Sequence, residues 1–84
     1  MSYFVYIVRC RGGNYYTGVT TDPKRRLYEH NHTDKGARYT RARRPVELVY
    51  IESVRDRSRA QQREYFIKQL SHQEKRLLIR NALT

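Results

Sequence analysis

Four side chains suited to phosphate chemistry are clustered near the start of the chain. They are two phenols, Tyr6 and Tyr16, one guanidinium, Arg26, and one imidazole, His30. A guanidinium can bind two phosphate oxygens in a planar fork, and a phenol can donate or accept a hydrogen bond. An imidazole titrates near neutral pH and can help to move a proton. In combination, these residue types favour a site that binds and reacts with a phosphate ester.

A helix must present Arg26 and His30 together. Asp22 can accept hydrogen bonds from the free N–H groups at a helix start, and Pro23 suits the first helical position. A helix is therefore predicted over 23–31. Residues four apart on a helix leave the same face, with Cβ atoms about 5–6 Å apart. Taken singly, Arg26 has an ordinary alternative as a solvated residue, and His30 as a favourable charge near a helix C-terminus.

Two strands must carry the tyrosines. Residues 3–10 are β-branched and aromatic and almost continuously apolar, which predicts a central strand covered on both faces. A turn signal at 11–14 and a second strand over 15–19 complete a β-hairpin. Tyr6 and Tyr16 can then face each other on one side of the sheet. Each alone has the alternative of a core tyrosine with a solvated hydroxyl.

The remaining segments complete a small α+β domain. Eighty-four residues make one domain, 1–84. The predicted order is ββαβαα, with a three-stranded sheet, formed by the hairpin and a third strand, flanked by helices. The further elements are an irregular basic segment over 32–45, a strand over 46–54, a helix from a cap at Asp56 or Ser58 to about Leu70, and a helix over 72–82 that begins with capping-box spacing at Ser71 and Glu74.

The charge of the chain indicates an anionic polymer as partner. There are 18 Lys and Arg residues, 14 of them Arg, against 8 Asp and Glu, for a formal net charge of +10. Arginine favours bidentate contact with phosphate, so nucleic acid is the leading candidate. The alternatives are a ribosome-associated or merely soluble basic protein, and we expect no membrane partner.

The cysteine content and the hydropathy favour a cytoplasmic protein. Cys10 is the single cysteine, so neither an internal disulfide nor a Cys-based zinc site is expected, which fits a reducing compartment. The apolar run from Tyr3 to Val8 is too short for a signal peptide. No stretch is long enough to span a bilayer.

A basic segment follows the first predicted helix. Arginine interleaved with an aromatic residue suits contact with a nucleic-acid backbone and stacking on an exposed base, although a solvated loop is the alternative. Five like charges in ten residues repel one another, and a polyanion would relieve that repulsion. The predicted nucleic-acid contacts are Lys35, Arg38, Tyr39, Arg41, Arg43 and Arg44.

Several segments in order resemble the GIY-YIG nuclease family. Phe4-Val5-Tyr6 is followed by Tyr16-Thr17-Gly18, and then by Arg26 and His30. The segments "YTGVTTDPKRRLYEHN", "KGARYTRARRPVELVY" and "REYFIKQLS" are similar to the small stand-alone bacterial members of that family. The resemblance covers about residues 3–70.

The resemblance implies a metal-dependent nuclease. It implies that Arg26 contacts phosphate and that Glu64 holds one divalent ion, Mg²⁺ or Mn²⁺. Gly18 matches the glycine that closes the second motif. The implied catalytic residues are Tyr6, Tyr16, Arg26, His30 and Glu64. Whether Tyr6 or His30 acts as the general base stays open.

Helical periodicity alone does not select Glu64. The predicted apolar stripe of the helix that contains it consists of Ala60, Phe66, Ile67 and Leu70, with Glu64 at its edge. Arg63 projects nearer the centre of the stripe. Periodicity does not distinguish Glu64 from the other candidate carboxylates, Glu29, Glu47, Glu52 and Glu74.

The chain departs from the family pattern in a few places. The first motif lacks its glycine and isoleucine, and threonine stands in the middle of the second. Val19 stands where some relatives have a lysine, and Asn81 is the one candidate for a late asparagine. Three hypotheses follow. The first is an endonuclease that cuts DNA, or alternatively RNA. The second is a non-catalytic nucleic-acid-binding module on the same fold. The third, a protein-interaction domain, leaves the arginines unexplained.

Overall fold

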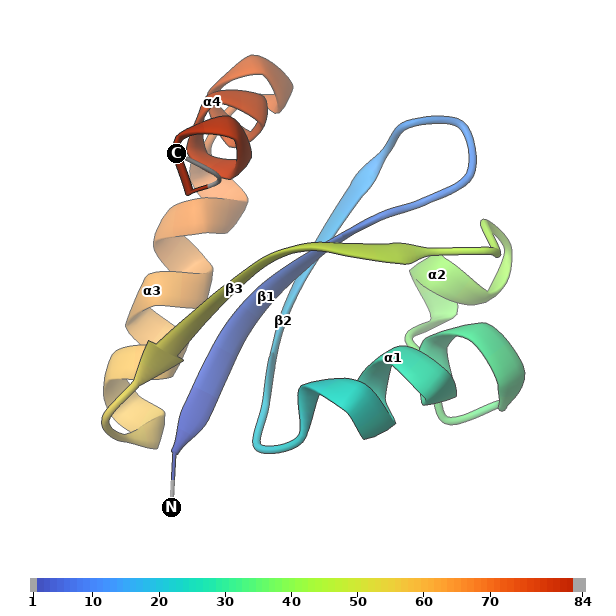
Figure 1. Cartoon of the computed structure of the whole chain (residues 1–84), viewed down its shortest axis with the longest axis horizontal. Coiled ribbons are helices and arrows are strands. Elements are labelled where there is room, and N and C mark those ends of the chain that lie inside the picture. The colour runs from blue at the N-terminus through green and yellow to red at the C-terminus, as the bar shows by residue number, and fades with distance from the viewer. Residues whose placement is uncertain (1, 83–84) are drawn as a thin grey trace.

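The most apolar strand lies at the centre of the sheet, as predicted. In the computed structural model, which describes residues 2–82, three antiparallel strands are ordered β2-β1-β3, with helices on both faces (Figure 1). The elements are β1 (Tyr3–Arg9), β2 (Tyr15–Thr20), α1 (Pro23–His32), α2 (Arg38–Arg41), β3 (Glu47–Val54), α3 (Arg57–Gln69) and α4 (His72–Ala82). The predicted α+β architecture is confirmed.

The alternation of side chains along β1 divides the core into two clusters. Val5 and Ile7 are fully buried and pack with residues of α3 and α4 on one face. Tyr6 and Val8 point to the opposite face and pack with Leu27 of α1. Successive strand residues point to opposite faces, so β1 must be apolar along its length to serve both clusters. Tyr6 is thereby directed toward α1.

The N-termini of the three long helices are capped by the residues that the sequence indicates. In each case a side-chain oxygen accepts a hydrogen bond from a backbone N–H that has no partner within the helix. The cap of α3 is Asp56 rather than Ser58. The donor–acceptor pairs are Arg25 N–H to Asp22 Oδ1 at 3.1 Å, Arg59 N–H to Asp56 Oδ1 at 2.8 Å, Glu74 N–H to Ser71 Oγ at 3.1 Å, and Ser71 N–H to Glu74 Oε1 at 2.8 Å.

The segment predicted to be irregular contains one turn of helix. The backbone N–H groups of Thr40 and Arg41 both donate to the carbonyl of Ala37, which closes α2. Thr40 is fully buried, whereas Arg38 and Arg41 are exposed. The sequence did not indicate this helical turn because three of its four residues are exposed and two of them are basic, so no apolar pattern marks it. It lies beside α1 (Figure 1).

The apolar stripe predicted for α3 was wrong at Phe66. Ala60 and Ile67 are fully buried, but 53% of Phe66 is exposed. The buried line along α3 is narrower than a full amphipathic stripe, and Phe66 turns outward beside the Arg63 guanidinium, 5.2 Å from its ring centroid. Within residues 2–82 no helix has the length and apolar character needed to cross a membrane.

Candidate active site

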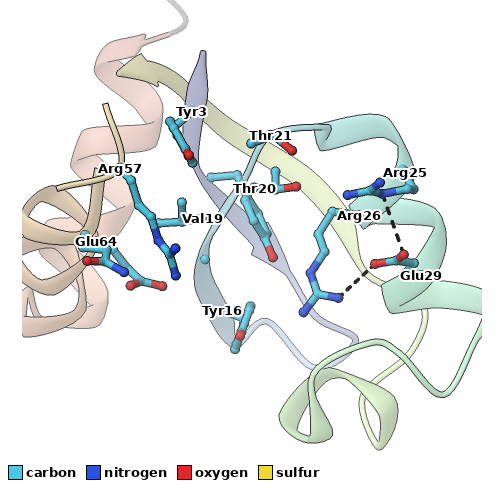
Figure 2. Close-up of a pocket in the computed structure, with 13 residues that line it drawn as sticks. Tyr3, Tyr16, Val19, Thr20, Thr21, Arg25, Arg26, Glu29, Arg57 and Glu64 are labelled. Carbon is cyan, nitrogen blue, oxygen red and sulfur yellow. Dashed lines mark hydrogen bonds and ion pairs between the residues drawn. The ribbon is translucent and has the colours of Figure 1, made fainter. Parts of the chain in front are cut away.

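A cleft of about 530 Å³ lies across the open edge of the sheet. Because β2 is an edge strand, α1 on one face and α3 on the other can both contribute side chains around it. Figure 2 shows Arg26 and Glu29 on the α1 side of β2 and Glu64 on the α3 side. Tyr6 and Tyr16 also line this cleft. It therefore unites four of the five predicted catalytic residues, and the fifth, His30, lies directly behind Tyr6.

Gly18 lets Tyr6 reach the cleft. The two residues are direct partners in the β1–β2 register. A Cβ atom on Gly18 would lie 2.5 Å from the Tyr6 hydroxyl oxygen and 2.7 Å from Cζ, which is closer than real Cβ contacts allow. Gly18 is therefore required by the close approach of the Tyr6 side chain, and not by a positive φ. Among the described residues, only Gly12 and Gly13 have positive φ.

Tyr6 and His30 form a buried hydrogen-bonded pair. The Tyr6 hydroxyl lies 2.7 Å from His30 Nε2, and the two side chains are 3% and 0% exposed. Burial raises the pKa of Tyr6 to about 12. Burial, followed by the positive charge of Arg26, lowers the pKa of His30 to about 4. At neutral pH both side chains are therefore uncharged, and the pair shares one phenolic and one imidazole proton.

Arg26 is held in the cleft by Glu29 and Lys35, and it also interacts with the Tyr6 hydroxyl. Its Nη1 atom donates to Glu29 Oε1 at 3.0 Å and to the carbonyl of Lys35 at 2.8 Å. Both contacts use the same nitrogen, so they orient the guanidinium fork within the cleft. Arg25 pairs with the same carboxylate at 3.8 Å. Because the Glu29 carboxylate is paired with two arginines, it is unsuited to hold a metal ion.

Tyr16 is brought to the same side of the sheet as Tyr6. It is the register partner of Val8, which points to the α1 face with Tyr6. Its ring packs edge-on against His30, with centroids 5.4 Å apart. The predicted convergence of two phenols, one guanidinium and one imidazole is therefore present in the structure.

Glu64 faces the cleft from α3, beside two residues that sequence reasoning missed. Arg57, Gln61 and Glu64 all line the cleft. Their spacing of four and then three residues places them on one helix face, and this was the signal available in the sequence. The Glu64 Oε2 atom lies 3.4 Å from Lys68 Nζ in a partly exposed ion pair. Figure 2 shows Arg57 and Glu64 on the same side of β2.

The surroundings of Glu64 suit an ion such as Mg²⁺, which needs few protein ligands, better than an ion that needs several. Residues 2–82 contain no group of three or more His, Cys, Asp or Glu side chains arranged around a common point. Mg²⁺ prefers oxygen ligands and usually keeps several waters, so one carboxylate and a substrate phosphate can suffice. The Gln61 amide oxygen is a second hard donor on the same cleft wall. Asn81 lies in α4 and is not among the cleft residues.

Tyr39 anchors the basic segment beside the cleft. Its hydroxyl accepts a hydrogen bond from Asn14 Nδ2 at 3.0 Å, and its ring lies 6.1 Å from that of Tyr16. The Arg43 guanidinium sits 3.8 Å above the Tyr39 ring centroid. One ring face is therefore covered by Arg43, which limits how a base could stack there.

Arg44 and Lys35 have structural contacts in addition to any they make with nucleic acid. The Arg44 guanidinium donates to backbone carbonyls at the C-terminal end of α1, those of Glu29, His30 and Thr33. A guanidinium at a helix C-terminus satisfies free carbonyls and complements the helix dipole. The carbonyl of Lys35 accepts from Arg26, while its side chain is exposed. Lys35, Arg38 and Arg41 are the exposed cations of the segment, whereas Arg43 and Arg44 are half-buried.

A second groove, of about 230 Å³, continues from the cleft past Tyr16. Tyr16 lines both spaces. Two lysines, Lys68 and Lys75, line this groove together with Tyr39. Ammonium groups beside phenol hydroxyls suit contact with the phosphate backbone of a nucleic acid.

A family model and several relatives match most of this chain. The GIY-YIG catalytic domain family matches residues 2–77. A UPF0213 protein from Desulfotalea psychrophila is 61% identical over 79 residues, which cover 94% of this chain and 72% of the relative. A UPF0213 protein from Halobacterium salinarum is 54% identical over 74 residues, or 88% of this chain and 95% of the relative.

Two solution NMR structures share the fold. A UPF0213 protein from Bacillus halodurans has a TM-score of 0.60 and 42% identity, over 94% of this chain and 83% of that chain. A protein from E. faecalis has a TM-score of 0.65 and 37% identity, over 100% of this chain and 90% of that chain. The names of these relatives state no activity.

Proposed function

The chain belongs to the GIY-YIG catalytic domain family, and from that premise we propose that it is an endonuclease that hydrolyses phosphodiester bonds in DNA, or alternatively in RNA, with the help of Mg²⁺ or Mn²⁺. One observation carries the proposal. A single cleft contains a fixed guanidinium, a phenol hydrogen-bonded to an imidazole, and a carboxylate that is free of arginine partners.

The phosphate is assigned to Arg26. Its guanidinium is already oriented by Glu29, by the carbonyl of Lys35 and by Tyr6, so little freedom is lost when it binds two phosphate oxygens. Tyr16, on the same wall, donates to a third oxygen. Charge that develops on the phosphate during attack is stabilised by these fixed donors.

The proton of the attacking water is assigned to the Tyr6–His30 pair. A phenol with a pKa of about 12 is protonated at neutral pH. It cannot serve as a base unless it passes on its own proton, and His30 Nε2, 2.7 Å away, can accept that proton in the tautomer that carries its hydrogen on Nδ1. The two residues therefore act in series.

Glu64, with Gln61 beside it, would hold the metal ion. When bound there, the ion supplies Lewis-acid polarisation of the scissile phosphate and neutralises charge on the leaving oxygen. The Lys68 ammonium lies 3.4 Å from Glu64 Oε2, where the metal ion would bind. When the ion binds, Lys68 would leave Glu64 and pair with a phosphate of the substrate.

Substrate binding is assigned to the exposed cations around the cleft. Arg38 and Arg41 of α2 project into solvent, and Lys68 and Lys75 face the groove that adjoins Tyr16. A net charge of +10 steers a polyanion toward this surface.

A substrate survey tests the proposal. The chain is incubated with single-stranded, duplex and branched DNA and with RNA, each with Mg²⁺, with Mn²⁺ or with EDTA. We expect cleavage of at least one substrate with either ion and none in EDTA. Tight binding without cleavage in every condition would favour the alternative, a non-catalytic nucleic-acid-binding module, for which Val19 in place of a lysine is the motivating feature.

A further inference from the structure

Thr40 lies on the far side of His30 from Tyr6 and has no role in the function proposed above. Thr40 and His30 are both fully buried. The Thr40 Oγ1 atom lies 2.8 Å from His30 Nδ1 and 2.9 Å from the carbonyl oxygen of Ala37. With Tyr6 at Nε2 on the opposite edge of the ring, a continuous hydrogen-bonded line runs from the cleft to α2.

A count of hydrogens assigns the proton of the His30 ring. A carbonyl oxygen can only accept, so the single hydroxyl hydrogen of Thr40 is donated to Ala37. The Thr40 oxygen then accepts a hydrogen bond, and the donor facing it is Nδ1–H. A neutral imidazole carries one ring hydrogen, so Nε2 has a lone pair and accepts from the Tyr6 hydroxyl.

The opposite tautomer fits the geometry less well. Thr40 would have to donate to Nδ1, and its oxygen would then face the Ala37 carbonyl at 2.9 Å with no hydrogen between them. Two acceptors in that arrangement repel each other in a buried site. The Ala37 backbone N–H favours this tautomer, but it lies 3.4 Å from Nδ1, against 2.8 Å for Thr40.

We propose that Thr40 is a positioning residue that holds His30 in the Nδ1–H tautomer, so that Tyr6 passes a proton from the cleft to His30. The inference rests on the proposed nuclease function for its catalytic consequence. With its hydrogen directed at Nε2, the Tyr6 oxygen turns its lone pairs to the cleft, where Arg26 also interacts with it. It can accept a proton only as it donates its own.

The proton transfers balance as follows. The attacking water loses one proton to the Tyr6 oxygen, the Tyr6 proton moves to Nε2, and the water oxygen bonds to phosphorus. The bond from phosphorus to the leaving oxygen breaks, and that oxygen takes a proton from solvent. His30, then an imidazolium, returns its proton through Tyr6. Burial opposes an imidazolium at His30 most strongly, and the positive charges of Arg26 and Arg44 add to it, while Glu29 favours it. A phosphate on Arg26 offsets the contribution of that arginine.

The tautomer can be measured in the free protein by ¹⁵N NMR of the His30 ring, without substrate or metal. We expect hydrogen on Nδ1 and a bare Nε2 near pH 7.5. Thr40→Val removes the hydroxyl and should move the hydrogen to Nε2, whereas Thr40→Ser should keep the parent tautomer. Hydrogen on Nε2 in the parent would overturn the inference, and this measurement stands even where Thr40→Val does not fold.

Cleavage assays separate this inference from the proposed function. Thr40→Val should lose at least about tenfold in cleavage rate with unchanged nucleic-acid affinity, and Thr40→Ser should restore most of the rate. A Thr40→Val protein with a shifted tautomer and the parent rate would overturn the role of Thr40 and leave the nuclease standing. A parent chain without cleavage would overturn the nuclease, and the tautomer would still be decided by NMR.

Discussion

The hydroxyl oxygen of Tyr6 lies 2.5 Å from the point where a Cβ atom on Gly18 would stand. The two residues come from different strands, β1 and β2, and are direct register partners. Each belongs to one of the two short motifs of the family. Tyr6, which closes the first motif, therefore explains why glycine closes the second. The Tyr6 phenol occupies the space on β2 that a side chain at position 18 would fill.

Gly18→Ala should destabilise the fold by about 1–3 kcal/mol, because the new methyl group overlaps the Tyr6 ring. Urea unfolding measures the change in free energy. In a Tyr6→Ala background the same substitution should cost much less, since the clashing ring is gone. Equal costs in the two backgrounds would show that the contact does not govern this position.

Arg26→Lys should lower the cleavage rate about tenfold or more, equivalent to roughly 1.4 kcal/mol of barrier, while the fold survives. An ammonium cannot supply the planar fork that binds two phosphate oxygens. Arg76→Lys on α4, an exposed position outside the cleft, is the matched control and should cleave like the parent. If both variants retain the parent rate, Arg26 is not the phosphate ligand.

The stability of the chain should fall as the pH drops from about 6.5 to about 4. The unfolded state takes up a proton on His30 near pH 6.5, whereas burial delays this to a pKa of about 4 in the folded state. The folded state thus binds fewer protons than the unfolded state in that pH range. The titration of His30 lowers the free energy of unfolding by at most about 3 kcal/mol. Urea unfolding at pH 7 and 4.5 measures it. The dependence should shrink in His30→Gln and persist in His32→Gln; the reverse pattern would refute the assignment.

The salt dependence of binding tests the basic surface. Each phosphate contact on duplex DNA contributes about −0.9 to the slope of log K against log salt. The paired substitution Arg38→Ala and Arg41→Ala should therefore flatten the slope by about 2. The control, Arg76→Ala and Arg80→Ala on α4, removes the same charge from another face. Equal changes in the two proteins would indicate non-specific attraction rather than contact by α2.

The sequence predicted the elements well where local chemistry determines them. The apolar run of β1, the caps at Asp22 and Asp56, and the Ser71–Glu74 pair all act within a few residues of one another. The convergence of Tyr6, Arg26 and His30 was also foreseeable, since a hairpin and one helix face are sufficient to derive it.

Other features depend on contacts between distant segments. Arg44 was predicted to contact nucleic acid because it belongs to a basic segment interleaved with Tyr39. Its hydrogen bonds to the end of α1 depend on how residues 33–44 fold back. Thr40 has no pattern that marks it as a partner of His30, ten residues earlier. Arg57 and Gln61 share a helix face with Glu64, but only the packing of α3 beside β2 turns that face toward the cleft.

The most direct test of the proposed mechanism is the cleavage rate of Glu64→Gln with Mg²⁺ or Mn²⁺, paired with a binding titration at fixed salt. The substitution keeps the size of the side chain and removes the charge that would hold the metal ion. Glu47→Gln, on the exposed end of β3, removes the same charge away from the cleft and serves as the control. We predict that Glu64→Gln loses cleavage by orders of magnitude while its affinity stays level or rises, because a carboxylate no longer repels phosphate. An active Glu64→Gln protein, or parent cleavage that persists in EDTA, would contradict a metal-dependent nuclease centred on Glu64.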